Sequence, residues 1–211
     1  MTVIAIDGTF ASGKGTLGKR LAAHYRLGYL DTGKLYRAVG HSVLQAGLNP
    51  SDAKACADIA RELDVALLSN PILKSGDVAV AASKVAVHAD VRAALLSFQR
   101  SFAQGGAVLD GRDIGTVICP DADVKIYIDA APEERARRRH LELTGYGEDI
   151  SFETVQAQLA ERDNRDKTRK EATLIPADDA HLIDTTKLDI EAVFDLAEQI
   201  VDGVLIKLGK K

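Results

Sequence analysis

The chain has 211 residues, of which 46% are hydrophobic and 27% are charged, and its formal net charge is −4. This composition is typical of a globular protein with enough apolar residues for a core, and the charge gives no support to general nucleic-acid binding. No run approaches the roughly 18 apolar residues that cross a bilayer, and the first predicted strand begins too early for a secretory signal. We therefore expect a cytoplasmic protein with no membrane or nucleic-acid partner. Cys56 and Cys119 lack metal-ligand spacing, which predicts free thiols in a reducing compartment.

The order of predicted elements favours one α/β domain. Apolar runs predict strands at 3–6, 29–30, 107–109, 124–128 and 181–183. Helical patterns lie between and after them, at 14–27, 34–46, 89–103, 132–143 and 189–207. Gly28 and Gly47 are expected to end the first two helices, and Asp189 to cap the last. This alternation predicts a doubly wound parallel sheet, with a ligand at the carboxyl ends of its strands.

Two ranges interrupt the alternation. In 51–87, a helix over 51–63 and a short apolar run lead to turn residues at 69–71 and 75–77, which predict a small insertion with a hairpin. The run at 144–152 is expected to form a mobile loop between two charged helices.

A glycine-rich segment joins the first predicted strand to the first predicted helix. We call residues 8–16 the glycine loop; they are Gly8, Thr9, Phe10, Ala11, Ser12, Gly13, Lys14, Gly15 and Thr16. Between a strand and a helix, such a segment directs backbone N–H groups and the helix dipole at one small volume, which suits phosphate. Lys14 can reach the terminal phosphates, and the Thr16 hydroxyl can face Mg²⁺. The alternative is a glycine-rich turn beside an ordinary helix.

Further charged side chains follow two of the predicted strands. After 107–109, Asp110 is expected to organise Mg²⁺, Arg112 to bind a phosphate, and Asp113 to accept hydrogen bonds from an amino group. The alternative is a solvated polar turn. After 29–30, Thr32 is expected to cap the next helix. Arg37 is expected to bind an acceptor phosphate, and Tyr36 to form a wall of the same cleft. That segment is equally consistent with an ordinary capped helix start.

A third group of charges lies on predicted helices. Arg162, Asp166 and Arg169 fall at i, i+4 and i+7 on one helical face. On such a face the aspartate can bind ribose hydroxyls, and the two arginines on either side of it can bind phosphate. The run at 135–138 is as consistent with a solvated face of i,i+4 pairs as with a site.

Together these motifs resemble the bacterial cytidylate kinases over nearly the whole chain. The matching pieces are IDG…SGKGT at 6–16, LDTGKLYR at 30–37, AASKVA at 81–86, DGRDIGTV at 110–117 and ERDNRD at 161–166. The resemblance implies an α/β fold of the P-loop NTPase type, a five-stranded parallel sheet wrapped by helices. It implies a single domain over 1–211, with a core at about 1–50, 88–143 and 166–211, a short NMP-binding insertion at about 51–87 and a lid at about 144–165. A monomer is favoured.

The resemblance also implies an activity and a set of residue roles. The activity is transfer of phosphate from ATP to CMP and dCMP with Mg²⁺. The glycine loop would bind ATP, Thr16 and Asp110 would hold the metal, and the catalytic residues would be Lys14, Asp110, Arg112 and Arg162. The substrate residues would be Thr32, Arg37, Arg112 and Arg169 for the acceptor phosphate; Ser83, Arg92 and Asp113 for cytosine; Arg162 and Asp166 for ribose; and Tyr36 as a wall. The alternatives are another small P-loop kinase, for UMP, shikimate or dephospho-coenzyme A, and a nucleotide-dependent switch protein.

Overall fold

The structure, a computed structural model, describes residues 1–168 and 173–210. Contacts divide the chain into two compact units. The first, called here the sheet unit, consists of Met1–Leu30 and Arg100–Lys211, and the second, the helical unit, is Asp31–Gln99. None of the described helices combines the length and apolar character that a membrane span requires.

The sheet has five strands in the order β2-β3-β1-β4-β5. Their bounds are β1 Val3–Gly8, β2 Gly28–Asp31, β3 Ala107–Asp110, β4 Val124–Asp129 and β5 His181–Asp184. β1 runs parallel to β3 and β4, and Ile6 lies opposite both Asp110 and Ile126. β5 runs parallel to β4 on the other side. The α/β class and all five predicted strands are therefore confirmed.

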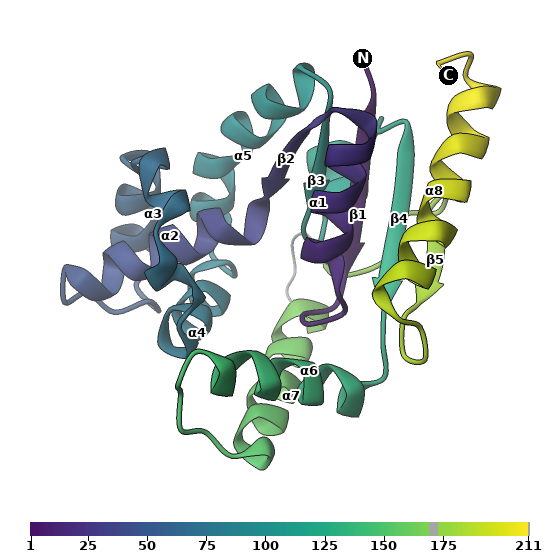
Figure 1. Cartoon of the computed structure of the whole chain (residues 1–211). Helices are drawn as coiled ribbons and strands as arrows, with labels where there is room; N and C mark the ends of the chain where they lie inside the picture. The colour runs from purple at the N-terminus through teal and green to yellow at the C-terminus, as the bar shows by residue number, and fades with distance from the viewer. Residues whose placement is uncertain (169–172, 211) are drawn as a thin grey trace. The chain divides into compact units, whose positions relative to one another are not determined.

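Helices of the sheet unit cover the strands and extend beyond them. Figure 1 shows α1 (Lys14–Tyr25) and α8 (Ile190–Lys207) alongside the strands. The apolar residues of both helices join one buried cluster with those of the sheet, including Ile4, Leu21 and Val201. α6 (Pro132–Gly145) and α7 (Phe152–Thr168) pack on each other around a separate apolar cluster. Both lie beyond the carboxyl ends of β1 and β4 (Figure 1).

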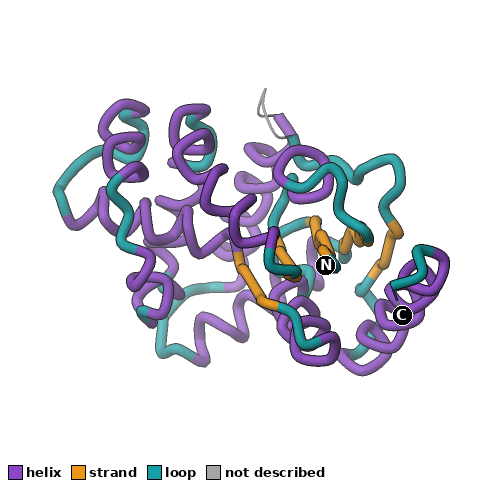
Figure 2. The backbone as a smooth tube through the Cα atoms, turned by 90° about the horizontal axis from the view of Figure 1, so that it is seen from above, coloured by secondary structure: helices purple, strands orange, loops and turns teal. Residues whose placement is uncertain are grey.

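The helical unit is built around α2 (Thr32–Gln45), α3 (Ala53–Arg61), α4 (Gly76–Val85) and most of α5 (Ala89–Gln104). No strand lies among α2, α3 and α4 (Figure 2), all of whose residues the structure describes. Leu35, Cys56 and Val85 belong to its buried core. Gly40 permits a close approach of α2 to α4, because a Cβ there would lie 2.8 Å from the Ala82 nitrogen.

The predicted hairpin in 51–87 is wrong. Two short 3₁₀ helices, η1 (Val65–Ser69) and η2 (Pro71–Lys74), lead directly into α4. The Asp64 carboxylate accepts from the Ala66 N–H, and the Asn70 side chain accepts from the Ile72 N–H. Residue types that favour turns also cap helices, and here they begin short helices.

Two predicted helix ends also differ from the structure. α1 ends at Tyr25, because Arg26 adopts a left-handed conformation (φ 55°), while Gly28 begins β2. The cap of α2 is Asp31 rather than Thr32, since the Asp31 carboxylate accepts from the Lys34 N–H at 3.2 Å. Thr32 is the first helical residue.

Other predicted features are confirmed. Gly47 follows α2 with φ 67°, which suits a glycine after a helix end. Asp189 caps α8 by accepting from the Ala192 N–H at 2.8 Å. A loop joins α6 to α7 within the predicted range 144–152. Cys56 and Cys119 are free thiols, the first buried and the second half-buried.

Candidate active site

The path of the glycine loop depends on main-chain conformations that glycine permits. Gly8 has φ 145°, and a Cβ there would lie only 1.9 Å from the Ile128 carbonyl oxygen. Gly13 has φ 99° at the N-cap of α1, and Ala11 is also left-handed at φ 61°. Because the first N–H groups of a helix lack partners within that helix, the loop and α1 together offer donors for an anion.

Lys14 is a buried cation held across the loop. Its ammonium donates to the Thr9 carbonyl oxygen at 2.6 Å. Burial lowers the pKa of Lys14, repulsion from Arg112 and Arg162 lowers it further, and attraction to Asp110 and Asp7 opposes the shift. The four residues predicted to be catalytic, Lys14, Asp110, Arg112 and Arg162, therefore lie within electrostatic range at one end of the sheet unit.

Asp110 lies buried at the end of β3, beside the start of α1. It accepts from the Tyr29 hydroxyl at 2.5 Å, and its Oδ2 lies 3.8 Å from where a Cβ on Gly15 would be. Thr16 is exposed in the first turn of α1. Among the described residues, no group of three or more His, Cys, Asp or Glu side chains is arranged as a metal site.

Asp7 is a buried acid for which the sequence predicted no role. Its two carboxylate oxygens accept from the Ile114 and Gly115 N–H groups, each at 2.7 Å. Burial raises the pKa of Asp7 to about 6, although both hydrogen bonds oppose the shift. These bonds fix the start of the π-helical turn η3 (Ile114–Ile118), directly after the buried Asp113. The only signal in the sequence was an acid at the end of an apolar run.

The charges on α6 and α7 divide into exposed and buried pairs. Arg137 is 58% exposed and pairs with Glu134, as expected for a solvated face. Arg135 is only 3% exposed and pairs with Asp163 at 2.6 Å. Arg112 donates through Nε to Asp166 at 2.5 Å, so a predicted phosphate ligand and a predicted ribose ligand bind each other.

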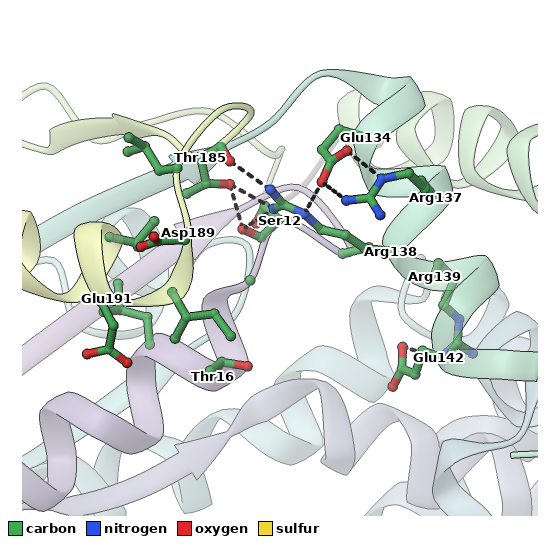
Figure 3. A pocket seen from close by; sticks show the side chains of 16 residues that line it. Ser12, Thr16, Glu134, Arg137, Arg138, Arg139, Glu142, Thr185, Asp189 and Glu191 are labelled. Carbon is green, nitrogen blue, oxygen red and sulfur yellow. Dashed lines mark hydrogen bonds and ion pairs between the residues drawn. The ribbon is translucent and has the colours of Figure 1, made fainter. Parts of the chain in front are cut away.

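A cavity of about 730 Å³ lies beside the glycine loop, and Figure 3 shows the side chains that line it. Thr185 donates from Oγ1 to the Ser12 carbonyl oxygen at 3.0 Å, and Arg138 donates to Thr185. The cavity has a size suited to a small organic ligand. Its remaining lining residues are Leu17 of α1, Glu134, Arg137, Arg138, Arg139 and Glu142 of α6, and Thr185, Leu188, Asp189, Ile190, Glu191 and Val193 after β5. Of these residues, the sequence pointed only to Arg137 and Arg138 as part of a site, since they lie in the charged run at 135–138.

The helical unit carries the other predicted substrate residues. Arg37 pairs with Asp31 at 2.6 Å, and the Arg92 guanidinium lies 5.5 Å from the Tyr36 ring centroid. Thr32 in α2 and Ser83 in α4 are buried. Arg169 lies outside the described residues.

The family model described as "Cytidylate kinase" matches residues 4–203 of the chain. The chain belongs to the cytidylate kinase family. A relative of that name from Xanthobacter autotrophicus is 56% identical over 203 residues, covering 95% of this chain and 97% of the relative. Another, from Nitrobacter winogradskyi, is 52% identical over 210 residues, covering 99% of each chain.

The fold also has a counterpart among solved structures. An uncharacterized protein from Eubacterium ventriosum aligns with a TM-score of 0.57 at 17% identity, covering 96% of this chain and 99% of that one. The likeness shows that the two chains share a fold.

Proposed function

We infer that this chain transfers the γ-phosphoryl group of ATP to CMP and dCMP, forming ADP with CDP or dCDP. The observation that carries the inference is the grouping of Arg112, Arg162 and Asp110 around the buried Lys14, in a chain that the cytidylate kinase family model matches over residues 4–203. The buried lysine and two arginines suit a group whose charge spreads over three equatorial oxygens during transfer.

The reaction needs no general base in this scheme. The bond between the γ-phosphorus and the β,γ-bridging oxygen breaks, while a bond forms from an oxygen of the CMP phosphate. That oxygen is already an anionic nucleophile. The protein therefore contributes positioning, charge neutralisation and exclusion of water. The anionic phosphates also favour the charged form of Lys14, which burial alone disfavours.

The residues present fit a magnesium ion bound together with phosphates. Mg²⁺ in such sites is held by one or two carboxylates, hydroxyls and substrate oxygens, so a cluster of several acids is not needed. The buried carboxylate of Asp110 and the hydroxyl of Thr16 would hold the ion. When bound, Mg²⁺ would neutralise charge on the β- and γ-phosphates.

The cavity beside the glycine loop is our candidate for the adenosine of ATP. It shares Ala11, Ser12, Gly13 and Thr16 with that loop, so a nucleoside there would lead directly to the phosphate-binding N–H groups. Leu188, Ile190 and Val193 offer apolar contact, and the arginines of α6 offer polar contact.

For the acceptor, the residue roles implied by the family stay predictions. We propose that Thr32, Arg37, Arg112 and Arg169 bind the acceptor phosphate, and that Tyr36 lines its site. Ser83, Arg92 and Asp113 would read the cytosine edge, and Arg162 and Asp166 would contact the ribose. We also propose a monomer in the cytoplasm, with a core at about 1–50, 88–143 and 166–211, an NMP-binding insertion at about 51–87 and a lid at about 144–165.

A panel of acceptors with an ADP-release assay tests the function. CMP, dCMP, UMP, shikimate and dephospho-coenzyme A are supplied in turn with ATP and Mg²⁺. We expect the highest kcat/KM for CMP and dCMP, and only background ADP release from the Lys14→Ala variant. A higher kcat/KM for UMP, shikimate or dephospho-coenzyme A would overturn the proposal.

A further inference from the structure

We propose that Phe10 is a positioning residue whose ring holds the guanidinium of Arg162 beside Lys14. This inference rests on the proposed function, because it assigns a task to one side chain of the same site. The glycine loop is expected to bind phosphate through its main chain and Lys14, so the aromatic side chain at position 10 needs a separate explanation.

Several arginines gather around the Phe10 ring. The Arg162 guanidinium carbon lies 3.8 Å from the ring centroid, and those of Arg139 and Arg112 lie at 5.4 and 5.9 Å. Attraction between a cation and a ring face acts within about 6 Å. Arg162 is therefore the cation in closest contact, and it comes from α7, far along the chain from the loop.

The ring is fixed by both its side chain and its main chain. The side chain packs against the apolar cluster of α6 and α7, which includes Ala136 and Leu159. The Phe10 carbonyl oxygen accepts from Arg135 at 3.3 Å, and Arg135 is held in turn by Asp163. A ring anchored in this way presents a defined surface to Arg162.

A ring suits this position because it attracts a guanidinium without cancelling its charge. Arg162 lies close enough to Lys14 to disfavour the charged lysine, so the two cations repel in the absence of phosphate. The negative face of an aromatic ring offsets part of that cost. The full positive charge of Arg162 stays available to the transferred phosphoryl group.

The test distinguishes the aromatic character of the Phe10 side chain from its apolar volume. Phe10→Leu and Phe10→Met keep apolar contact with α6 and α7 but remove the ring, whereas Phe10→Tyr keeps the ring. We expect both aliphatic variants to lower kcat about tenfold, with the KM for ATP and for CMP changed less than about twofold. The tyrosine variant should retain most of the wild-type kcat. In a double-mutant cycle, Arg162→Lys should cost less in the Phe10→Leu background than in the wild type.

The chain offers a matched control outside the site. The Arg20 guanidinium lies 4.3 Å from the Phe194 ring centroid, where α1 faces α8. Phe194→Leu removes a similar contact, and we expect its kcat and KM to equal those of the wild type. A change in kcat as large as that of Phe10→Leu would overturn the specific role of Phe10.

A spectroscopic measurement keeps this inference separate from the proposed function. The ring current of Phe10 should move the Arg162 side-chain N–H resonance upfield in the wild type and in Phe10→Tyr, but not in Phe10→Leu. Arg162→Lys identifies that resonance by its loss. An Arg162 resonance that does not move between wild type and Phe10→Leu overturns the proposal, as does equal impairment of kcat in the leucine and tyrosine variants. If the shift is found but CMP is not phosphorylated, the proposed function falls and the placement of Arg162 on the ring stands.

Discussion

The glycine loop and the helix pair α6–α7 hold their cations in different ways. In the loop, Lys14 donates to a main-chain oxygen, and the backbone path depends on Gly8 and Gly13. On the helix pair, carboxylates hold several of the arginines, as in the buried pair of Arg135 and Asp163. Mutations in the two regions should therefore have different effects on activity and stability. Loss of the loop lysine should remove activity alone, whereas loss of a carboxylate on the helix pair should lower stability and activity together.

Lys14→Ala should give the largest effect on activity. Removing a cation aimed at the β- and γ-phosphates should lower kcat by about 10²- to 10³-fold, the scale of one strong transition-state donor. Stability should change little, because the desolvated ammonium is itself costly to bury. Steady-state kinetics and urea unfolding measure both quantities, with the exposed Lys19→Ala as control. A near-normal kcat at saturating ATP would contradict the role of the loop.

Asp163→Asn should instead lower the stability of the protein through the helix pair α6–α7. It removes the closer of two carboxylates from Arg135, which is 3% exposed, and leaves only Asp129 at 4.0 Å, so we expect the free energy of unfolding to fall by about 3 kcal/mol. The kcat should fall too, because Arg135 also binds the Phe10 carbonyl oxygen. Asp58→Asn is the matched control, since its pair with Arg61 is exposed and should contribute less than about 1 kcal/mol. Equal losses of stability in the two variants would contradict the distinction.

Asp7 should make stability depend on pH. The pKa of Asp7 is about 6 in the folded protein and near 3.8 when unfolded. The protonated carboxyl therefore stabilises the folded state fully below about pH 4, and this stabilisation is lost as the pH rises through 6. The free energy of unfolding of the wild type, relative to Asp7→Asn, should therefore fall by about 2.5 kcal/mol between pH 4 and pH 7. Urea unfolding of both proteins across this range measures the difference. A difference that does not vary with pH would show that the Asp7 carboxyl does not titrate in this way.

Asp166→Ala tests both roles of a single acid, because Asp166 is paired with Arg112 and is also predicted to bind ribose. If it binds ribose, the KM for CMP should rise about tenfold and that for dCMP should rise less, since dCMP lacks the 2′-hydroxyl. Loss of the pair with Arg112 should lower kcat for both acceptors. Lys167→Ala, on an exposed position of α7, serves as control. Equal changes in KM for both acceptors would leave Asp166 as a positioning residue for Arg112 only.

Asp113→Asn should give the smallest effect, a change in the preference for CMP over UMP with no change in the fold. A carboxylate accepts from the cytosine amino group, whereas an amide can donate to the uracil carbonyl. The ratio of kcat/KM for CMP over UMP should therefore drop several-fold, measured with both acceptors at several concentrations. An unchanged ratio with lower activity would assign Asp113 to the phosphate machinery.

The same two regions show what sequence can predict. The strands, the glycine loop and the cap of α8 depend on residues close together in the chain, and the sequence predicted them correctly. The partners of the buried charges are distant: Arg135 and Asp163 are 28 residues apart, Arg112 and Asp166 are 54 apart, and Asp7 and Ile114 are 107 apart. No local pattern encodes such pairs. The hairpin was predicted wrongly for a related reason, because Asp64 and Asn70 suit a turn and a helix cap equally well.

The ratio of CDP to ADP formed from ATP, CMP and Mg²⁺ tests whether this protein transfers phosphate from ATP to CMP. If the cations of the sheet unit direct the γ-phosphoryl group to an acceptor, the wild-type protein should form CDP and ADP in equal amounts. It should form almost no ADP when CMP is left out. ADP release without CMP, at a rate comparable to that with it, would contradict phosphoryl transfer to CMP and favour a nucleotide-dependent switch.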